Sequence, residues 1–229
     1  MPGGTAAKRA RPAALDAAVT TLAVPGLGLP WGIFVLADGN RLVASASKNT
    51  IFQLPPSGRL ATLAGNRGKL GELKDGEGIF ARFKSPYGLT VDRAGNVVVA
   101  DSSNNAVRTV TRGGAVVSTL AGNGEAGFVD GQGPNARFNE PHSVVVAANG
   151  DFIVSDTGNH SIRVLSPDGA VRTLVGNREE GFVDGQGADA RFSYPSGLAM
   201  DPEGNVLVAD WGNCAIRKVT MAGAVSTGT

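Results

Sequence analysis

The sequence predicts an all-β protein, a β-propeller of four-stranded antiparallel blades, on three observations. One pattern recurs four times at a spacing of about 55 residues, the length of a single supersecondary unit in a repeat protein. Short apolar segments rich in β-branched residues alternate with glycine-containing turns along these repeats. The composition, with 33 glycines and only 6% aromatic residues, suits many short strands joined by tight turns.

A proline opens each of the four copies. Pro30, Pro86, Pro141 and Pro195 follow one another at 56, 55 and 54 residues (86 − 30, 141 − 86 and 195 − 141). The last three copies share further residues at matching offsets: Asp101, Asp156 and Asp210; Asn104, Asn159 and Asn213; Arg108, Arg163 and Arg217. An Asp-Gly pair followed by Ala-Arg-Phe precedes each of these three copies. A period kept at so many positions indicates units stacked on one another.

The second copy shows how a repeat divides into strands. Residues 88–92 and 96–101 are apolar segments around a turn at Gly95, where glycine can take the positive φ of a tight reversal. Residues 106–111 and 116–120 form a second pair around a Gly-Gly turn. Segments this short, separated regularly by turn residues, predict a meandering four-stranded unit and argue against helix.

A four-stranded unit of this kind has an apolar face on each side and cannot bury either face alone. Stacking the units face to face around an axis covers both faces, and that radial arrangement is the propeller. A linear β-solenoid is the alternative architecture, but its coils usually have shorter repeats.

The residues of the fourth copy resemble a known repeat. Residues 195–217 read PSGLAMDPEGNVLVADWGNCAIR, and this pattern resembles the NHL repeat, over a region that extends from residue 19 to residue 229. The Asp-Gly connection, DGQGPNARF at residues 130–138, looks like that of bacterial and plant NHL proteins and of proteins that join NHL repeats to a thioredoxin-like domain. This chain contains no Cys-x-x-Cys motif of such a domain.

Two copies depart from the pattern. The third has Ser143 and Ala147 where the second and fourth have glycine and aspartate. The first has Ser45 at the position of the repeated aspartate and Phe52 at the position of the repeated arginine.

The resemblance implies a ring of six blades, whereas this chain supplies four repeats. The repeats are expected at about 24–83, 84–138, 139–192 and 193–229, within a propeller region 19–229 that follows a disordered tail over residues 1–18. Residues 19–23 and 224–227 both match the final strand of a repeat, so neither end supplies the strand that would close the other. The ends therefore predict a partial propeller or a fragment of a six-bladed ring, with a strained four-bladed ring as the alternative. A partial ring would leave two apolar faces uncovered and promote self-association.

Charge and cysteine content exclude several classes. The formal net charge of +1 provides no field that would hold nucleic acid or an anionic membrane. The single cysteine, Cys214, cannot form an internal disulfide. The first residues show no secretory signal and no apolar run is long enough to cross a bilayer, which favours the cytoplasm.

The repeated polar residues are interpreted as structural. Each repeated aspartate is expected to accept hydrogen bonds from the turn that follows it, together with the repeated asparagine. Each repeated arginine is expected to join neighbouring strands through carboxylate or carbonyl groups. The alternatives are a Ca²⁺ site formed by the carboxylates and an anion site formed by the arginines.

Positions that vary between copies are the candidate binding residues. Trp31, Tyr87, His142 and Ser196 follow the four opening prolines, where a propeller lines its central opening. The turns after the second strand add Asn105, His160 and Trp211. Aromatic and amphipathic residues of this kind are common at interaction surfaces, although they could also be loop residues without a role.

The sequence therefore predicts a non-catalytic scaffold that binds a protein partner through this loop face. Single-stranded RNA binding is one alternative, although most arginines occupy repeated structural positions. A propeller hydrolase, lyase or lactonase with an axial metal is another, but His142 and His160 with Glu140 are a sparse ligand set. No cofactor, metal site or catalytic residue is predicted.

Overall fold

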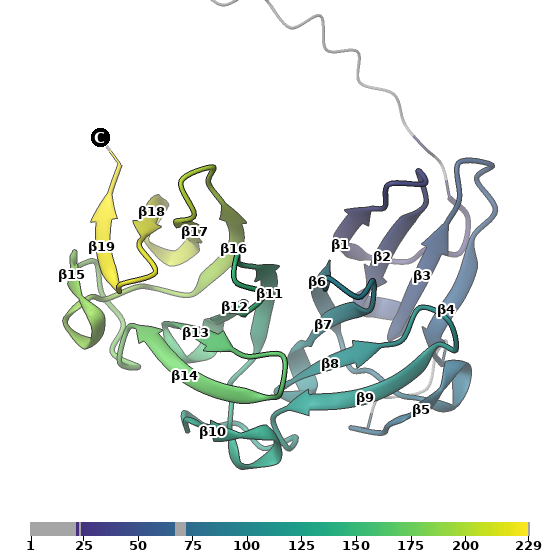
Figure 1. Ribbon diagram of the computed structural model, residues 1–229, viewed down its shortest axis with the longest axis horizontal. Helices are drawn as coiled ribbons and strands as arrows, with labels where there is room; N and C mark the ends of the chain where they lie inside the picture. The colour runs from purple at the N-terminus through teal and green to yellow at the C-terminus, as the bar shows by residue number, and fades with distance from the viewer. Residues whose placement is uncertain (1–21, 23, 67–71, 229) are drawn as a thin grey trace, which may run out of the picture.

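The computed structural model describes residues 22, 24–66 and 72–228 and confirms the predicted all-β architecture. Four antiparallel sheets follow one another around a common axis in a propeller-like ring (Figure 1). We call these sheets blades 1 to 4 in chain order. The expected tail over residues 1–18 and the strand expected at residues 19–23 lie outside the described residues, apart from Leu22.

Each blade is a meander in which consecutive long strands pair. Blade 1 contains β1 (Pro30–Val35), β2 (Arg41–Ser45), β3 (Thr50–Leu54) and β4 (Ala61–Gly65). Blade 2 contains β5 (Gly76–Glu77), β6 (Pro86–Val91), β7 (Val97–Asp101), β8 (Ala106–Val110) and β9 (Val116–Ala121). Blade 3 contains β10 (Gly131–Gln132), β11 (Pro141–Val146), β12 (Phe152–Asp156), β13 (Ser161–Leu165) and β14 (Ala170–Val175). Blade 4 contains β15 (Gly185–Gln186), β16 (Pro195–Met200), β17 (Val206–Asp210), β18 (Ala215–Val219) and β19 (Ala224–Thr227).

The helical turns are all short 3-10 turns. Four of them join the second and third strands of the blades: η1 (Ala46–Lys48), η3 (Ser102–Asn104), η5 (Thr157–Asn159) and η7 (Trp211–Asn213). Three follow the two-residue strands: η2 (Gly78–Phe80), η4 (Gly133–Asn135) and η6 (Gly187–Asp189).

The Asp-Gly connections add a strand that the sequence analysis did not anticipate. Strands β5, β10 and β15 each pair with the last long strand of the blade that follows them in sequence, so blades 2 to 4 have five strands. Each connection therefore crosses the outer edge of a blade before the chain enters that blade's inner strand (Figure 1).

Three apolar cores lie between successive blades. The phenylalanine of each Ala-Arg-Phe segment is fully buried in one of them: Phe83 between blades 1 and 2, Phe138 between blades 2 and 3, and Phe192 between blades 3 and 4. The strands of a blade contribute alternate residues to the cores on its two sides, because successive side chains of a strand point to opposite faces. The stacking of blades therefore buries what a single blade leaves exposed.

The inner strands β1, β6, β11 and β16 surround the axis and contact one another in that order. No comparable contact joins β16 to β1 within the described part of the chain, and Figure 1 shows an opening between blades 4 and 1. In each blade the opening proline pairs with the last residue of the second strand, as Pro141 does with Asp156. The starts of the inner strands and the 3-10 turns therefore lie at the same end of the ring.

Candidate functional site

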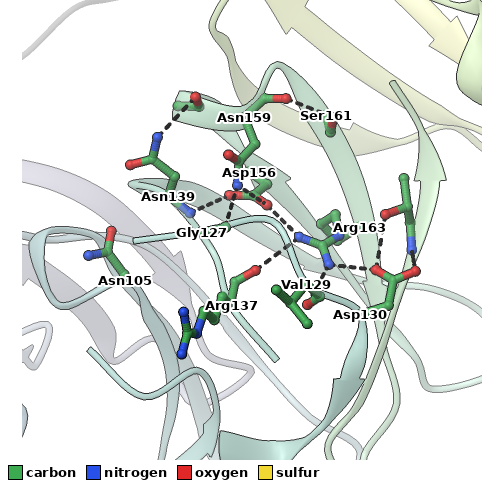
Figure 2. A network of polar contacts seen from close by, with 12 residues as sticks. Asn105, Gly127, Val129, Asp130, Arg137, Asn139, Asp156, Asn159, Ser161 and Arg163 are labelled. Carbon is green, nitrogen blue, oxygen red and sulfur yellow. Dashed lines mark hydrogen bonds and ion pairs between the residues drawn. The ribbon is translucent and has the colours of Figure 1, made fainter. Parts of the chain in front are cut away.

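A buried ion-pair network holds each of the last three blades together, and Figure 2 shows that of blade 3. In blade 3, Arg163 on β13 donates to Asp156 at the end of β12 over 2.6 Å, and both side chains are fully buried. Its other terminal nitrogen donates to Asp130 of the outer connection, also over 2.6 Å. The same guanidinium reaches the carbonyl oxygens of Val129 and Arg137 at 3.0 and 3.2 Å. One arginine thus ties the strands to the connection that wraps the blade.

The carboxylate of Asp156 has further donors on both oxygens. Its Oδ1 accepts from the backbone N–H of Asn139 at 2.7 Å, and its Oδ2 accepts from the side chain of Asn159 at 2.8 Å. Only the Asn159 contact comes from the turn that follows Asp156. The sequence predicts a backbone donor in the turn after Asp156. The observed backbone donor, Asn139, instead lies 17 residues before it.

Blades 2 and 4 repeat this network. Arg108 pairs with Asp101 and Asp75 at 2.7 Å each, and Arg217 pairs with Asp210 and Asp184 at 2.8 and 2.7 Å. The matching asparagines, Asn104 and Asn213, donate to the buried carboxylates at 2.9 and 2.8 Å. In blade 1, Ser45 and Phe52 occupy the same two positions and are also fully buried.

Aromatic rings surround the buried guanidinium groups. The Cζ of Arg163 lies 4.7 Å from the ring centroid of Phe128 and 5.4 Å from that of Phe138. Within the described residues, the Nε of each buried arginine has no hydrogen-bond acceptor. The planar guanidinium therefore uses its terminal nitrogens for ion pairs and its faces for cation–π contacts.

Burial and pairing shift the two kinds of carboxyl in opposite directions. Burial raises the pKa of Asp101 and of Asp156 to about 6, although the neighbouring arginine and the hydrogen bonds oppose this shift. Asp130 is also desolvated, but hydrogen bonds from Thr173 and Arg163 outweigh that effect and lower its pKa. At neutral pH these carboxyls are ionised and paired, and they provide no free ligand.

Asn105 and His160, two of the candidate binding residues, make contacts between neighbouring blades. The Oδ1 of Asn105 accepts from the backbone N–H of Glu140 in the next blade at 2.9 Å. The Nδ1 of His160 accepts from the N–H of Tyr194 at 3.1 Å. Both residues have left-handed backbones with φ near +50°, which turns their side chains toward the next blade. Their acceptors are therefore used within the fold.

Four of the other variable residues surround the axis. A cavity of about 550 Å³ is lined by all four inner strands, and no Asp, Glu, Lys or Arg is among its lining residues. Trp31, Tyr87, His142 and Ser196 lie at the end of this cavity where the inner strands begin. We call these four residues the mouth.

Three mouth residues form a row of rings. Trp31 and Tyr87 are stacked with centroids 4.5 Å apart, and His142 meets Tyr87 edge-on at 4.6 Å. The row brings together residues from three blades, and Trp31 at its end remains 62% exposed. Burial lowers the pKa of His142 to about 4, so its imidazole is neutral at physiological pH.

A second group of rings lies at the same end of blades 3 and 4. Tyr194 is 4.6 Å from His160 and 6.2 Å from Trp211, which is 71% exposed. Tyr194 was missed by the sequence analysis because it precedes the opening proline, at a position held by Ser85 and Glu140 in other copies.

The described residues contain no group of three or more His, Cys, Asp or Glu side chains placed to hold a metal ion. Within the same residues, no helix is long and apolar enough to cross a membrane. The lining of the axial cavity thus carries no charged side chain, and three of the four mouth residues are aromatic.

Comparison with known proteins identifies the repeats. The NHL repeat model matches residues 138–165 and 192–219. Protein SUPPRESSOR OF QUENCHING 1, chloroplastic, of Arabidopsis thaliana is 26% identical over 206 residues, which are 85% of this chain and 20% of that protein. NHL repeat-containing protein 2 of Bos taurus is 37% identical over 116 residues, 48% of this chain and 16% of that protein. The chain thus spans a fifth or less of the length of these relatives.

Solved structures show the same fold at low identity. An auxiliary nutrient binding protein from Bacteroides thetaiotaomicron aligns with a TM-score of 0.66 and 20% identity over 86% of this chain and 48% of its own. Virginiamycin B lyase from Staphylococcus aureus aligns with a TM-score of 0.54 and 12% identity, covering 90% of this chain and 71% of its own. From the matched segments and the blades they form, we conclude that this chain contains NHL repeats within a β-propeller.

Proposed function

We propose that this NHL-repeat propeller is a non-catalytic scaffold that binds a protein partner through its mouth. The observation that carries the proposal is the stacked pair of Trp31 and Tyr87, held by two different blades at the open end of the axial cavity. Exposed aromatic residues in a rigid frame provide large contact area at low entropic cost, and they dominate many protein interfaces.

The absence of charge around the cavity supports a protein surface as the ligand. The lining residues include no Asp, Glu, Lys or Arg, and His142 is neutral, so an apolar or aromatic side chain could enter without burying an unpaired charge. Single-stranded RNA would also stack on aromatic rings, but it needs cations along the same groove for its phosphates. The lining residues offer none.

Catalysis at the axis would need ligands or acid–base groups there. His142 is the one imidazole among the lining residues, which include no carboxylate, and burial keeps it neutral by lowering its pKa to about 4. A metal-dependent hydrolase or lyase uses at least three protein ligands. The lining set therefore favours binding over an axial metal reaction.

The test is affinity capture with three forms of the protein, using identified and quantified bound proteins as the readout. Wild type and a control, Phe80→Ala on the exposed η2 turn, should retain the same partner. The double variant with Trp31→Ala and Tyr87→Ala should lose it while keeping its melting temperature. Retention by the double variant would exclude the mouth as the site.

Two further measurements address the alternative functions. A fluorescent single-stranded RNA that binds in a salt-dependent manner would favour the nucleic-acid mode. One equivalent of zinc or calcium in the purified wild-type protein, absent from the His142→Ala variant, would favour a hydrolase or lyase with an axial metal.

A further inference from the structure

The three junctions between blades reuse one pair of faces. The second face of each blade, built from alternate residues of its strands, packs against the first face of the next blade. The third strand of each blade places one residue at the centre of this second face. In blades 1 to 3 these residues, Ile51, Val107 and Ile162, are fully buried. In blade 4 the equivalent residue, Ile216, is 58% exposed.

We call the exposed second face of blade 4 the trailing face. Its apolar residues are Gly197, Ala199, Leu207, Ala209 and Ile216, which are all partly or fully exposed, and Lys218, opposite Leu207 and ion-paired with Asp201 at 3.2 Å, lies beside them. A Cβ added at Gly32 would lie 2.3 Å from the carbonyl oxygen of Tyr87, and one added at Gly88 would lie 2.7 Å from that of His142. Gly197 occupies the same position, yet an added Cβ would meet only the Cβ of Ala209, at 3.6 Å. The space that receives a neighbouring inner strand in blades 1 and 2 is therefore open on blade 4.

The opposite end of the ring presents the matching surface. Ile33 on β1 is 63% exposed, whereas its equivalents Leu89 and Val144 are 7% and 2% exposed because each packs on the preceding blade. Val35 is exposed as well, and Leu27 takes the position of the buried phenylalanines. We call Leu27, Ile33 and Val35 the leading patch. Val43 and Leu54 lie on the same face of blade 1, farther from the axis, and they are buried. The leading patch is therefore the exposed part of the first face of blade 1, near the axis.

From these two faces we propose that copies of this chain associate head to tail, with the leading patch of one copy seated on the trailing face of another. The contact would reproduce a junction that the chain already makes three times. Because the two faces differ, the interface is heterologous, and it produces rings if the rotation closes and filaments if it does not.

The polar links at the junctions define the alignment of the two copies. At each internal junction a side chain after the 3-10 turn accepts from the N–H of the residue before the next proline: Asn49 from Ser85, Asn105 from Glu140, and His160 from Tyr194. The equivalent positions at the ends are Cys214 and Leu29, both exposed. Head-to-tail docking should therefore bring Cys214 of one copy next to Leu29 of another.

The first experiment measures mass by light scattering and sedimentation across the micromolar range, under reducing conditions. Wild type should form species larger than a monomer in a concentration-dependent manner. Ile33→Asp and Ile216→Asp should each be monomeric, because each blocks one of the two faces. An equimolar mixture should form a one-to-one dimer that grows no further, since one good face of each kind remains.

The behaviour of each variant measured alone separates the possible geometries of association. If Ile216→Asp is monomeric but Ile33→Asp still forms dimers, copies pair through two trailing faces and the proposal is wrong. Monomeric wild type over the whole range would also overturn it. Ile79→Asp is the matched control, since this isoleucine is similarly exposed on the η2 turn, and it should associate like wild type. Circular dichroism of each variant checks that it is folded.

The second experiment tests the alignment directly and does not depend on the charge variants. Under mild oxidation, Leu29→Cys should produce a ladder of disulfide-linked oligomers, because each copy then carries one cysteine at each end. Wild type can form only dimers, and Leu29→Cys combined with Cys214→Ser should form no ladder. Absence of a ladder from Leu29→Cys, with wild type associating, would exclude this alignment.

Discussion

Arg163 donates to Asp156 over 2.6 Å in an ion pair whose two side chains are both fully buried. The same pair recurs in blades 2 and 4, whereas blade 1 is built with Ser45 and Phe52 at these positions. Desolvation of two charges is costly, and buried pairs are often replaceable by packed apolar residues without loss of stability. The chain therefore contains a buried ion pair in three blades and uncharged residues at the same positions in blade 1. The free energies of the two arrangements can be compared within one molecule.

Breaking the pair on one side should be much more damaging than replacing it. We expect Asp156→Ala to destabilise the fold by about 3–5 kcal/mol, because Arg163 stays buried with one carboxylate partner removed. Asp130→Ala should cost only about 1 kcal/mol, since this partner is half-exposed. Urea unfolding at pH 7 measures both values, and similar losses in the two variants would contradict this ranking.

Copying the blade 1 solution into blade 3 should recover part of that loss. The double variant with Asp156→Ser and Arg163→Phe should be more stable than Asp156→Ala alone, because no unpaired charge remains buried. The two substitutions measured singly complete a double-mutant cycle. Additive effects would show that the pair is not coupled and that the surrounding hydrogen bonds carry its stability.

Glycine at the inner strands should matter only where a neighbouring strand approaches. Gly88→Ala places a methyl group 2.7 Å from the carbonyl oxygen of His142, so we expect a loss of about 1–3 kcal/mol. Gly197→Ala makes only an ordinary 3.6 Å contact with the Cβ of Ala209 and should change the free energy of unfolding by less than about 0.5 kcal/mol. Chemical denaturation of both variants provides the comparison, and an equal cost at both positions would refute it.

The neutral His142 should make stability depend on pH between 6.5 and about 4. Burial lowers its pKa in the folded chain to about 4, so in this window the unfolded chain binds the proton more readily. Stability therefore falls as pH decreases from 6.5 toward 4. We expect His142→Gln to remove on the order of 1 kcal/mol of this loss, after allowance for the partial exposure of the ring.

The comparison between wild type and His142→Gln is needed because other groups act in the opposite direction. The raised pKa of Asp101 and Asp156 favours the protonated folded state, so their contribution to stability increases as pH falls from about 6. The difference between the two unfolding curves isolates the histidine. A constant difference from pH 7 to pH 4 would show that His142 titrates normally.

The mouth should tolerate substitution far better than the cores. Trp31→Ala should cost less than about 1 kcal/mol because most of its ring is exposed, whereas Phe138→Ala should cost about 3–5 kcal/mol. Thermal unfolding followed by circular dichroism ranks the two. A large loss in Trp31→Ala would mean that the row of rings supports the fold, which would weaken the case for the mouth as a binding surface.

The sequence by itself determined the architecture and the position of the mouth. A period kept at proline, aspartate and arginine defines one unit, and an apolar alternation on both faces requires each unit to be covered by neighbours. Because every inner strand begins after its proline, Trp31, Tyr87 and His142 had to meet near the axis. These features depend on local spacing and on symmetry between copies, and both can be read directly from the chain.

Only the tertiary structure decided what individual side chains do. The outermost strand pairing of blades 2 to 4, formed by the two-residue strands, has too few residues to leave a pattern in the sequence. Asn105 and His160 vary between copies, and the hydrogen bonds that each accepts from the next blade depend on how the blades stack. The backbone partner of Asp156, Asn139, lies 17 positions before it, and this contact exists only once the connection has wrapped around the blade.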